Sequence, residues 1–132
     1  MGMAEREIDA IRALLSSKPR PVGWAERRER LDEVGSTWPP ASDVTCEAVD
    51  CDGVPGEWSV VPGSAPSRVL LYFHGGGYCS GSIVSHRRLV TEAGRTAGTR
   101  TLAIDYRRAP EHPYPSAHGD RGRREQDDHD FA

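Results

Sequence analysis

The stretch VLLYFHGGGY, residues 69–78, decides the fold of this 132-residue chain. Its first five residues are apolar without alternation, the pattern of a strand buried on both faces of a parallel sheet. Three glycines follow, and a backbone without Cβ atoms can turn sharply and bring its N–H groups against a ligand. A second apolar run, residues 101–104, lies beyond a helical segment at about residues 85–97. Strand, glycine loop, helix and strand form a βαβ unit, so the sequence predicts an α/β fold with a parallel strand pair.

The segment between the two apolar runs has the period of a helix. Its apolar positions recur three and four residues apart, and they are Leu89, Val90, Ala93 and Ala97. Ser85 stands at the start of this pattern and is expected to cap the helix. A helix at this place is the usual connection between two parallel strands.

Two further strands are expected before the VLLYF run. Residues 44–49 and 57–61 both alternate loosely between apolar and polar side chains, which is typical of half-buried strands. A Pro-Gly pair at residues 55–56 stands between them and favours a turn. The sequence therefore predicts that these two strands are neighbours and run antiparallel.

Residues 1–42 have a helical pattern and are expected to form two N-terminal helices. The first covers residues 4–17 and the second runs from Trp24 to Val34, with Gly35 as its C-terminal stop. The apolar stripe of the first helix consists of Ile8, Ile11, Leu14 and Leu15. Neither helix is apolar enough to stand alone, so we expect both to lie over the rest of the fold.

Composition divides the chain into three parts. After the helical residues 1–42, residues 43–117 hold the expected strands, the glycine loop and the βαβ unit. Residues 118–132, HGDRGRREQDDHDFA, have neither helical period nor strand alternation, so we expect a charged, disordered tail. The His and Asp side chains of this tail are interpreted as solvated groups rather than as metal ligands.

Charge and cysteine content exclude several classes of function. The chain has 17 basic and 20 acidic residues and a net charge of −3, which gives no support for nucleic-acid binding or for a polybasic membrane surface. Its longest apolar run is the VLLYF stretch, far below the roughly 20 residues of a membrane span. The three cysteines contain no C-x-x-C pair. Because residues 5–7 are charged where a signal peptide is apolar, we expect a cytoplasmic protein.

The HGGGY loop, residues 74–78, is the strongest candidate for chemistry. It follows a predicted buried strand and precedes a helix whose N-terminal end carries a partial positive charge. Such a loop suits an oxyanion hole, in which backbone donors stabilise the negative charge that develops during acyl transfer. A plain tight turn between strand and helix is the structural alternative.

A second notable segment, DYRRAPEHPYPSA at residues 105–117, begins where the next strand ends. Its three prolines within six residues force an extended path. Asp105, Arg107 and Glu111 are expected to pair as a buried scaffold rather than to act in catalysis. His112 is interpreted as a hydrogen-bonded loop residue.

The two motifs, at this spacing and with a helix between them, resemble the hormone-sensitive-lipase-like family of α/β-hydrolases, which are bacterial esterases and lipases. The resemblance covers about residues 4–117. It implies the N-terminal part of an α/β-hydrolase fold, with a mostly parallel sheet preceded by cap helices.

The same resemblance assigns roles to the loop. It implies that Gly76 and Gly77 supply the oxyanion-hole amides, while His74 and Gly75 shape the loop and Tyr78 lines the acyl pocket. The chemistry that it implies is hydrolysis of a small acyl ester through a Ser-His-Asp triad and an acyl-enzyme, with no cofactor and no metal.

The sequence departs from the family in one decisive respect. It contains no G-x-S-x-G nucleophile elbow, and the family-like pattern is judged to end at Ala117. We therefore expect a truncated or frameshifted product that keeps the HGGGY loop, lacks the Ser-Asp-His triad, and is inactive by itself.

Two other functions stay open. One is a non-catalytic fragment that binds acyl compounds, or that associates with a partner or with itself through an open sheet edge. The other is a Cys79-dependent hydrolase, because GYCSG at residues 77–81 fits a thiol version of the elbow with His86 as its base. Three glycines and a tyrosine separate Cys79 from its strand, however, so we favour a small residue beside the substrate cleft.

Overall fold

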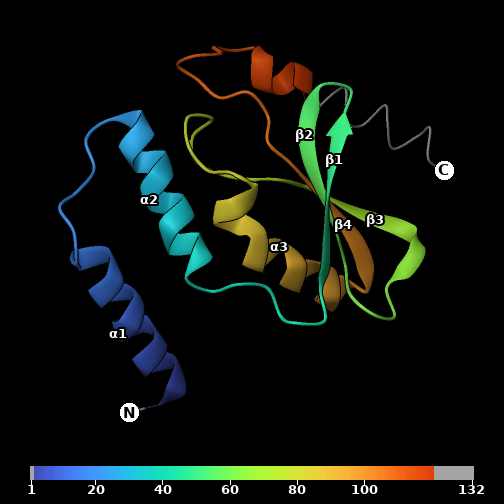
Figure 1. Ribbon diagram of the computed structural model, residues 1–132, viewed down its shortest axis with the longest axis horizontal. Helices are drawn as coiled ribbons and strands as arrows, with labels where there is room; N and C mark the ends of the chain where they lie inside the picture. The colour runs from blue at the N-terminus through green and yellow to red at the C-terminus, as the bar shows by residue number, and fades with distance from the viewer. Residues whose placement is uncertain (1, 121–132) are drawn as a thin grey trace.

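The structure is a computed structural model that describes residues 2–120, shown as a ribbon in Figure 1. The expected tail beyond residue 120 lies outside the described residues. In chain order the elements are α1 (Met3–Ser16), α2 (Trp24–Ser36), β1 (Thr45–Cys51), β2 (Val54–Val60), β3 (Ala65–Phe73), α3 (Ile83–Ala97) and β4 (Thr99–Ile104). Each helix and strand that the sequence predicted is present, with bounds that differ by a few residues.

The four strands form one sheet in the order β1-β2-β4-β3. The pair β3–β4 is parallel and is connected through α3, which confirms the predicted βαβ unit. The pairs β1–β2 and β2–β4 are antiparallel. The fold is therefore α/β as expected, but within residues 2–120 the sheet is mixed, and the expectation of mostly parallel pairing holds only for β3–β4.

The hairpin between β1 and β2 turns earlier than predicted. Asp52 and Gly53 form the turn with φ angles of +53° and +88°, and Asp-Gly is a favoured pair for a two-residue hairpin loop. Pro55 and Gly56 instead lie inside β2, opposite Asp50 and Val49, so the predicted Pro-Gly turn is wrong. A Cβ at Gly56 would lie 3.0 Å from the Cys51 sulfur, so this glycine serves close packing.

Strands β3 and β4 differ sharply in burial. Leu102 and Ile104 of β4 are 0% exposed, because β4 lies between β2 and β3 and these two side chains pack in a cluster with Cys51, Val54, Tyr106 and Ala117. The neighbouring Ala103 packs on the other face with Ile83 and Val90 of α3. Strand β3 pairs only with β4 in the described part of the chain, and its Val69 is 37% exposed. The prediction of a strand buried on both faces is therefore confirmed for β4 and is wrong for β3 within residues 2–120.

The N-cap of helix α3 lies three residues before the predicted cap, Ser85. Ser82 is the N-cap and accepts a hydrogen bond from the Ser85 amide at 3.1 Å, while the Ser85 hydroxyl accepts one from the Ser82 amide at 2.9 Å. The buried face of α3 consists of Ile83, Val90, Thr91 and Gly94. Leu89 is 57% exposed, so the buried face is rotated away from part of the predicted stripe.

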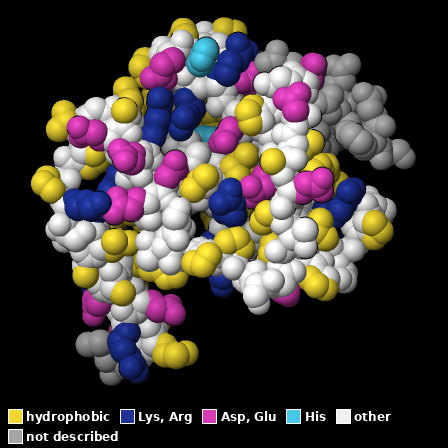
Figure 2. Space-filling model, viewed as in Figure 1, with side chains coloured by type: hydrophobic (Ala, Val, Ile, Leu, Met, Phe, Trp, Pro, Cys, Tyr) yellow, Lys and Arg dark blue, Asp and Glu magenta, His cyan; other side chains and the backbone are white. Residues whose placement is uncertain are grey.

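The two N-terminal helices relate differently to the rest of the molecule. Helix α2 packs against α3, whereas α1 extends away from the sheet (Figure 1). Gly35 lies inside α2 and does not stop it; a Cβ there would lie 2.5 Å from the Ser85 carbonyl oxygen. The glycine therefore allows a close helix–helix approach. Basic and acidic side chains are interspersed over α2 (Figure 2).

Residues 118–120 do not start a disordered tail. Residues 116–120 are helical, and Asp120 is 0% exposed. Its carboxylate accepts hydrogen bonds from the backbone N–H of Arg107 at 2.7 Å and from the guanidinium of the same residue. The boundary predicted at Ala117 is therefore wrong for these three residues. Among the described residues, no helix is long and apolar enough to cross a membrane.

Candidate active site

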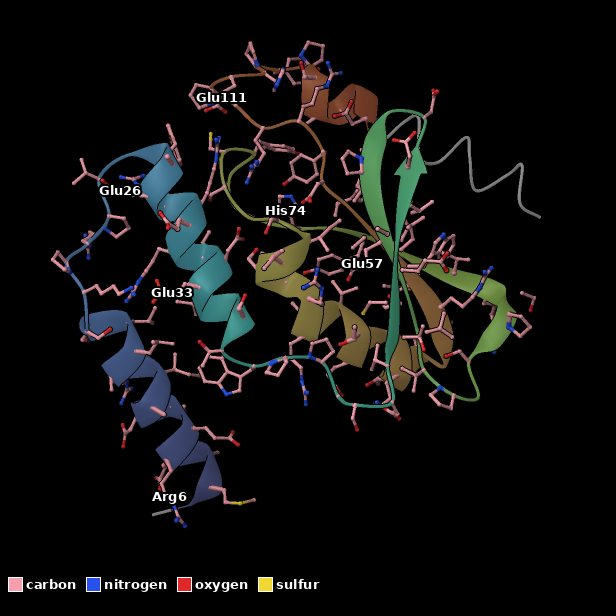
Figure 3. All side chains as sticks on the ribbon, in the orientation of Figure 1. Arg6, Glu26, Glu33, Glu57, His74 and Glu111 are labelled. Carbon is pink, nitrogen blue, oxygen red and sulfur yellow. The ribbon has the colours of Figure 1, made fainter. Side chains whose placement is uncertain are left out.

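The glycine loop lies at the carboxyl end of β3, where it connects this strand to α3. A cavity of about 390 Å³ is lined by Phe73, His74, Gly75, Gly76, Gly77, Tyr78 and Tyr106. Figure 3 shows His74 between the start of α3 and the segment that follows β4. The residues that the sequence singled out as a site therefore share one cavity wall.

The loop backbone depends on glycine at position 76. Gly76 has a φ of +128°, and a Cβ there would collide with the carbonyl of Ser80. The Gly76 carbonyl accepts hydrogen bonds from the amides of Cys79 at 3.2 Å and Ser80 at 3.1 Å. Gly77 has a φ of +63° and open space around its Cα. The chain is thus wound into a tight turn around the Gly76 carbonyl.

The amides of Gly76 and Gly77 are open to a ligand. Within residues 2–120 neither N–H donates a hydrogen bond to a protein acceptor, and both residues are exposed. Backbone donors that remain unpaired beside a cavity are the groups that an oxyanion hole uses. The arrangement can bind a small anion or a carbonyl oxygen that gains negative charge.

His74 is buried beneath the loop and is 5% exposed. Its Nδ1 lies 2.9 Å from the Gly75 carbonyl oxygen, its own carbonyl accepts a hydrogen bond from the Tyr106 hydroxyl at 2.6 Å, and the two rings stack at 4.2 Å. Burial lowers the pKa of His74, which favours the neutral form of the imidazole. These contacts fix the path of the chain as it leaves β3.

Tyr78 holds an unusual backbone conformation for a side chain of its size. Its φ is +62°, and its carbonyl accepts a hydrogen bond from the Ala109 amide at 2.9 Å. Its ring is 55% exposed. Tyr78 also lines a second cavity of about 250 Å³, together with Ala109, His112, Tyr114, Ala117 and His118. A ring in this position can contact a substrate that occupies either cavity.

The charged residues of the segment after β4 are paired, but not with one another as predicted. The Asp105 carboxylate accepts the amide of Ile83 at 2.8 Å at the start of α3. Arg107 pairs with Asp120 at 3.0 Å, and Glu111 pairs with Arg28 of α2 at 2.8 Å. Sequence analysis missed these partners because all of them lie outside the motif, and Asp120 was assigned to the tail.

The thiol version of the elbow is not formed. Cys79 follows the end of β3 at Phe73 by six positions, and its carbonyl is bound by Arg28. His86 lies on α3, where its Nδ1 is 2.8 Å from the Ser85 hydroxyl, and no interaction joins it to Cys79 in the described residues. Among residues 2–120 no group of three His, Cys, Asp or Glu side chains could hold a metal ion.

Comparisons with known proteins agree with the α/β fold of the chain. The model of a family described as the alpha/beta hydrolase fold matches residues 70–122, so the predicted end of the family pattern at Ala117 is wrong. An acetyl-hydrolase of Streptomyces hygroscopicus is 36% identical over 127 residues, which cover 87% of this chain and 39% of the relative.

Solved structures give the same picture. An esterase from the bacterial hormone-sensitive lipase family is 35% identical with a TM-score of 0.82, over 92% of this chain and 40% of the other. An esterase/lipase from an uncultured bacterium is 32% identical with a TM-score of 0.86, over 100% of this chain and 45% of the other. The chain spans less than half the length of these relatives. It belongs to the hormone-sensitive-lipase-like family of α/β-hydrolases and corresponds to the N-terminal part of that fold.

Proposed function

We propose that this chain supplies the oxyanion-binding part of a carboxylic ester hydrolase of the esterase or lipase type. The observation that carries the proposal is the pair of unpaired N–H groups of Gly76 and Gly77 beside the cavity. In ester hydrolysis the carbonyl oxygen becomes negatively charged in the tetrahedral intermediate, and preorganised amides stabilise that charge more strongly than the neutral substrate.

The other residues of the loop have supporting roles in this proposal. His74 and Gly75 hold the path of the chain into the turn, since the His74 ring is bound to the Gly75 carbonyl and stacked on Tyr106. Tyr78 lines the acyl side of the pocket, where its exposed ring meets a small acyl ester. No cofactor or metal is needed for this step.

The printed sequence contains no G-x-S-x-G elbow, so the 132-residue chain by itself is proposed to be inactive. The test is hydrolysis of p-nitrophenyl acetate by the purified chain. We expect the rate to equal that of buffer, because an oxyanion hole contributes on the order of 10²–10³-fold only when a nucleophile is present to use it. Turnover that survives both repeat purification and Cys79→Ser would overturn this part of the proposal.

A chimera tests the oxyanion role directly. Residues 4–120 of this chain would replace the matching region of the Streptomyces hygroscopicus acetyl-hydrolase. We expect the chimera to hydrolyse the acetate ester, and Gly76→Ala to lower its kcat on the order of 10²-fold, because the added Cβ collides with Ser80 and moves the loop. Gly119→Ala is the matched control, since Gly119 lies outside the cavity of the loop, has open space around its Cα and does not have a positive φ. Equal activity of both variants would contradict the proposal.

Self-association is a second candidate, favoured by the outer edge of β3. In the described residues β3 pairs with β4 alone, and an unpaired edge is a template for strand addition. We propose that the isolated chain associates through this edge. Analytical ultracentrifugation is expected to show dimers or larger species, which Val69→Lys reduces because a charge on an edge strand opposes pairing. A monomer of 14.5 kDa at all concentrations would contradict it.

A further inference from the structure

One face of α2 contacts the glycine loop and the start of α3 at regularly spaced residues. Positions 28, 32 and 35 lie on the same side of a helix, because they are four and seven residues apart. Arg28 binds the Cys79 carbonyl, Asp32 accepts the Ser82 hydroxyl at 2.5 Å, and Gly35 approaches the backbone of Ser85. The contacts of α2 therefore advance along the chain from the loop into α3, three residues at a time.

The Arg28 guanidinium is the most heavily bonded group of this face. Its Nε donates to the Cys79 carbonyl at 2.7 Å, and one terminal nitrogen donates to the Ala109 carbonyl at 2.8 Å. Both terminal nitrogens also donate to the Glu111 carboxylate, at 3.0 and 2.8 Å. The Arg28 side chain is 17% exposed, whereas Glu111 is 52% exposed and lies on the segment after β4 (Figure 3).

Two chains of hydrogen bonds lead from Arg28 into the glycine loop, one to Gly76 and one to Tyr78. In the first, Arg28 holds the carbonyl of Cys79, whose amide donates to the Gly76 carbonyl. In the second, Arg28 holds the carbonyl of Ala109, whose amide donates to the carbonyl of Tyr78, the residue after Gly77. The planar fork of arginine fixes several acceptors in a set geometry, whereas a lysine presents all of its donors from a single nitrogen atom.

We propose that Arg28 is a positioning residue that sets the orientation of the Gly76 and Gly77 amides from outside the cavity. The inference rests on the proposed oxyanion role of those amides. Helix α2, expected from the sequence to act as part of a cap, thus braces the loop through polar bonds. Arg28 lines none of the wall of the loop cavity and acts only through the backbone that it holds.

Hydrogen exchange of the 132-residue chain, followed by mass spectrometry, tests this without substrate. In Arg28→Met we expect a peptide covering residues 75–82 to exchange about tenfold faster, since charge-assisted bonds to two carbonyls are lost. Glu111→Gln keeps both carbonyl bonds and is expected to change this peptide by less than about twofold. Arg30→Met is the matched control, because Arg30 lies on the same helix and binds the carbonyls of Leu14 and Leu15 instead.

The outcomes separate positioning from general stability. An unchanged loop peptide in Arg28→Met, or an equal acceleration in Glu111→Gln, overturns the proposal. Arg28→Lys keeps the charge and one bond, so partial recovery of slow exchange supports it, even where Arg28→Met unfolds the chain. In an active chimera, Arg28→Met is expected to lower kcat about tenfold with KM within about twofold, and Arg30→Met to change neither. A chimera inactive with Arg28 in place refutes the ester chemistry and leaves the exchange result to decide the role of Arg28.

Discussion

Helices α1 and α2 stand next to each other in the chain and behave in opposite ways. Helix α1 has the clearer apolar stripe, yet Ile8 is 47% and Leu15 52% exposed, and no residue of α1 is buried. Helix α2 has the weaker stripe and is fixed to the body by Arg28 and by the close approach of Gly35. The difference teaches that apolar periodicity predicts a helix, whereas polar bonds and steric fit decide here what it docks against.

The attachment of α1 is correspondingly slight. Arg30 of α2 donates to the carbonyls of Leu14 and Leu15 at 2.7 and 3.0 Å, at the C-terminal end of α1. Lys18, in the connection between the helices, pairs with Glu33 at 2.7 Å. An exposed pair of this kind contributes little to stability. We therefore expect changes on α2 to affect the whole fold and changes on α1 to remain local.

The largest effect is expected from Gly35→Ala. The added Cβ would lie 2.5 Å from the Ser85 carbonyl oxygen, so α2 and α3 have to separate. We expect a loss of about 1–3 kcal/mol in the free energy of unfolding, measured by urea denaturation. Ala10→Val on α1 is the control and is expected to cost less than about 0.5 kcal/mol, because Ala10 is exposed. Similar losses of unfolding free energy in both variants would show that α1 and α2 are docked to the same extent.

Ser82→Ala is expected to have the next largest effect. The hydroxyl caps α3 and also donates to Asp32 of α2, so its loss removes two contacts of the docked region. We expect a cost of about 1–2 kcal/mol in thermal unfolding. Ser17→Ala serves for comparison, since that hydroxyl donates only to the Leu14 carbonyl at the exposed end of α1. If Ser17→Ala proved the more costly of the two, the assignment of α2 as the docked helix would be wrong.

Acid is expected to weaken the ion pair between Arg28 of α2 and Glu111. The hydrogen bond from Arg28 lowers the pKa of Glu111, so the pair stabilises the folded state above the ordinary carboxyl pKa of about 4.3. This stabilisation is lost as the pH falls through the lowered pKa. We expect the melting temperature to fall at acid pH slightly more in the parent chain than in Glu111→Gln, because the exposed pair contributes little to stability. Identical pH dependence in both chains would count against a role for the pair.

The smallest effect is expected from Ile11→Ser on α1. Ile11 is 37% exposed and packs in no buried cluster of the described residues. We expect the free energy of unfolding to change by less than about 0.5 kcal/mol. A loss well above 1 kcal/mol in the urea transition would show that the stripe of α1 is covered in solution.

The order and type of the elements could be predicted from the sequence, because each carries its own local signal. The βαβ unit was predicted from two apolar runs, a glycine loop and a helical period, and it is confirmed. The hairpin turn was misplaced because Pro55 and Gly56 were read as a turn, although Asp52 and Gly53 carry the stronger signal. Gly35 was predicted to be a stop because its steric role depends on Ser85 of α3, which lies 50 positions later in the chain.

The glycine loop was found from its residues, but its support was not. Arg28 lies 51 positions from Cys79 and 83 from Glu111, and a single sequence has no local signal for such pairs. The one available hint is that Arg28, Asp32 and Gly35 share a helical face. Asp120 was assigned to the tail for the same reason, since its partner Arg107 belongs to another motif.

The central position of β4 has a consequence for synthesis of the chain. A nascent chain emerges from the ribosome with its N-terminus first, and β1 with β2 forms a hairpin from contacts that are local in sequence. Strand β3 cannot join the sheet until β4 has emerged, because β4 lies between β3 and the hairpin. Until Leu102 and Ile104 have emerged, the apolar side chains that pack on them stay uncovered. Chains halted before β4 are therefore the nascent species that chaperones should bind most strongly.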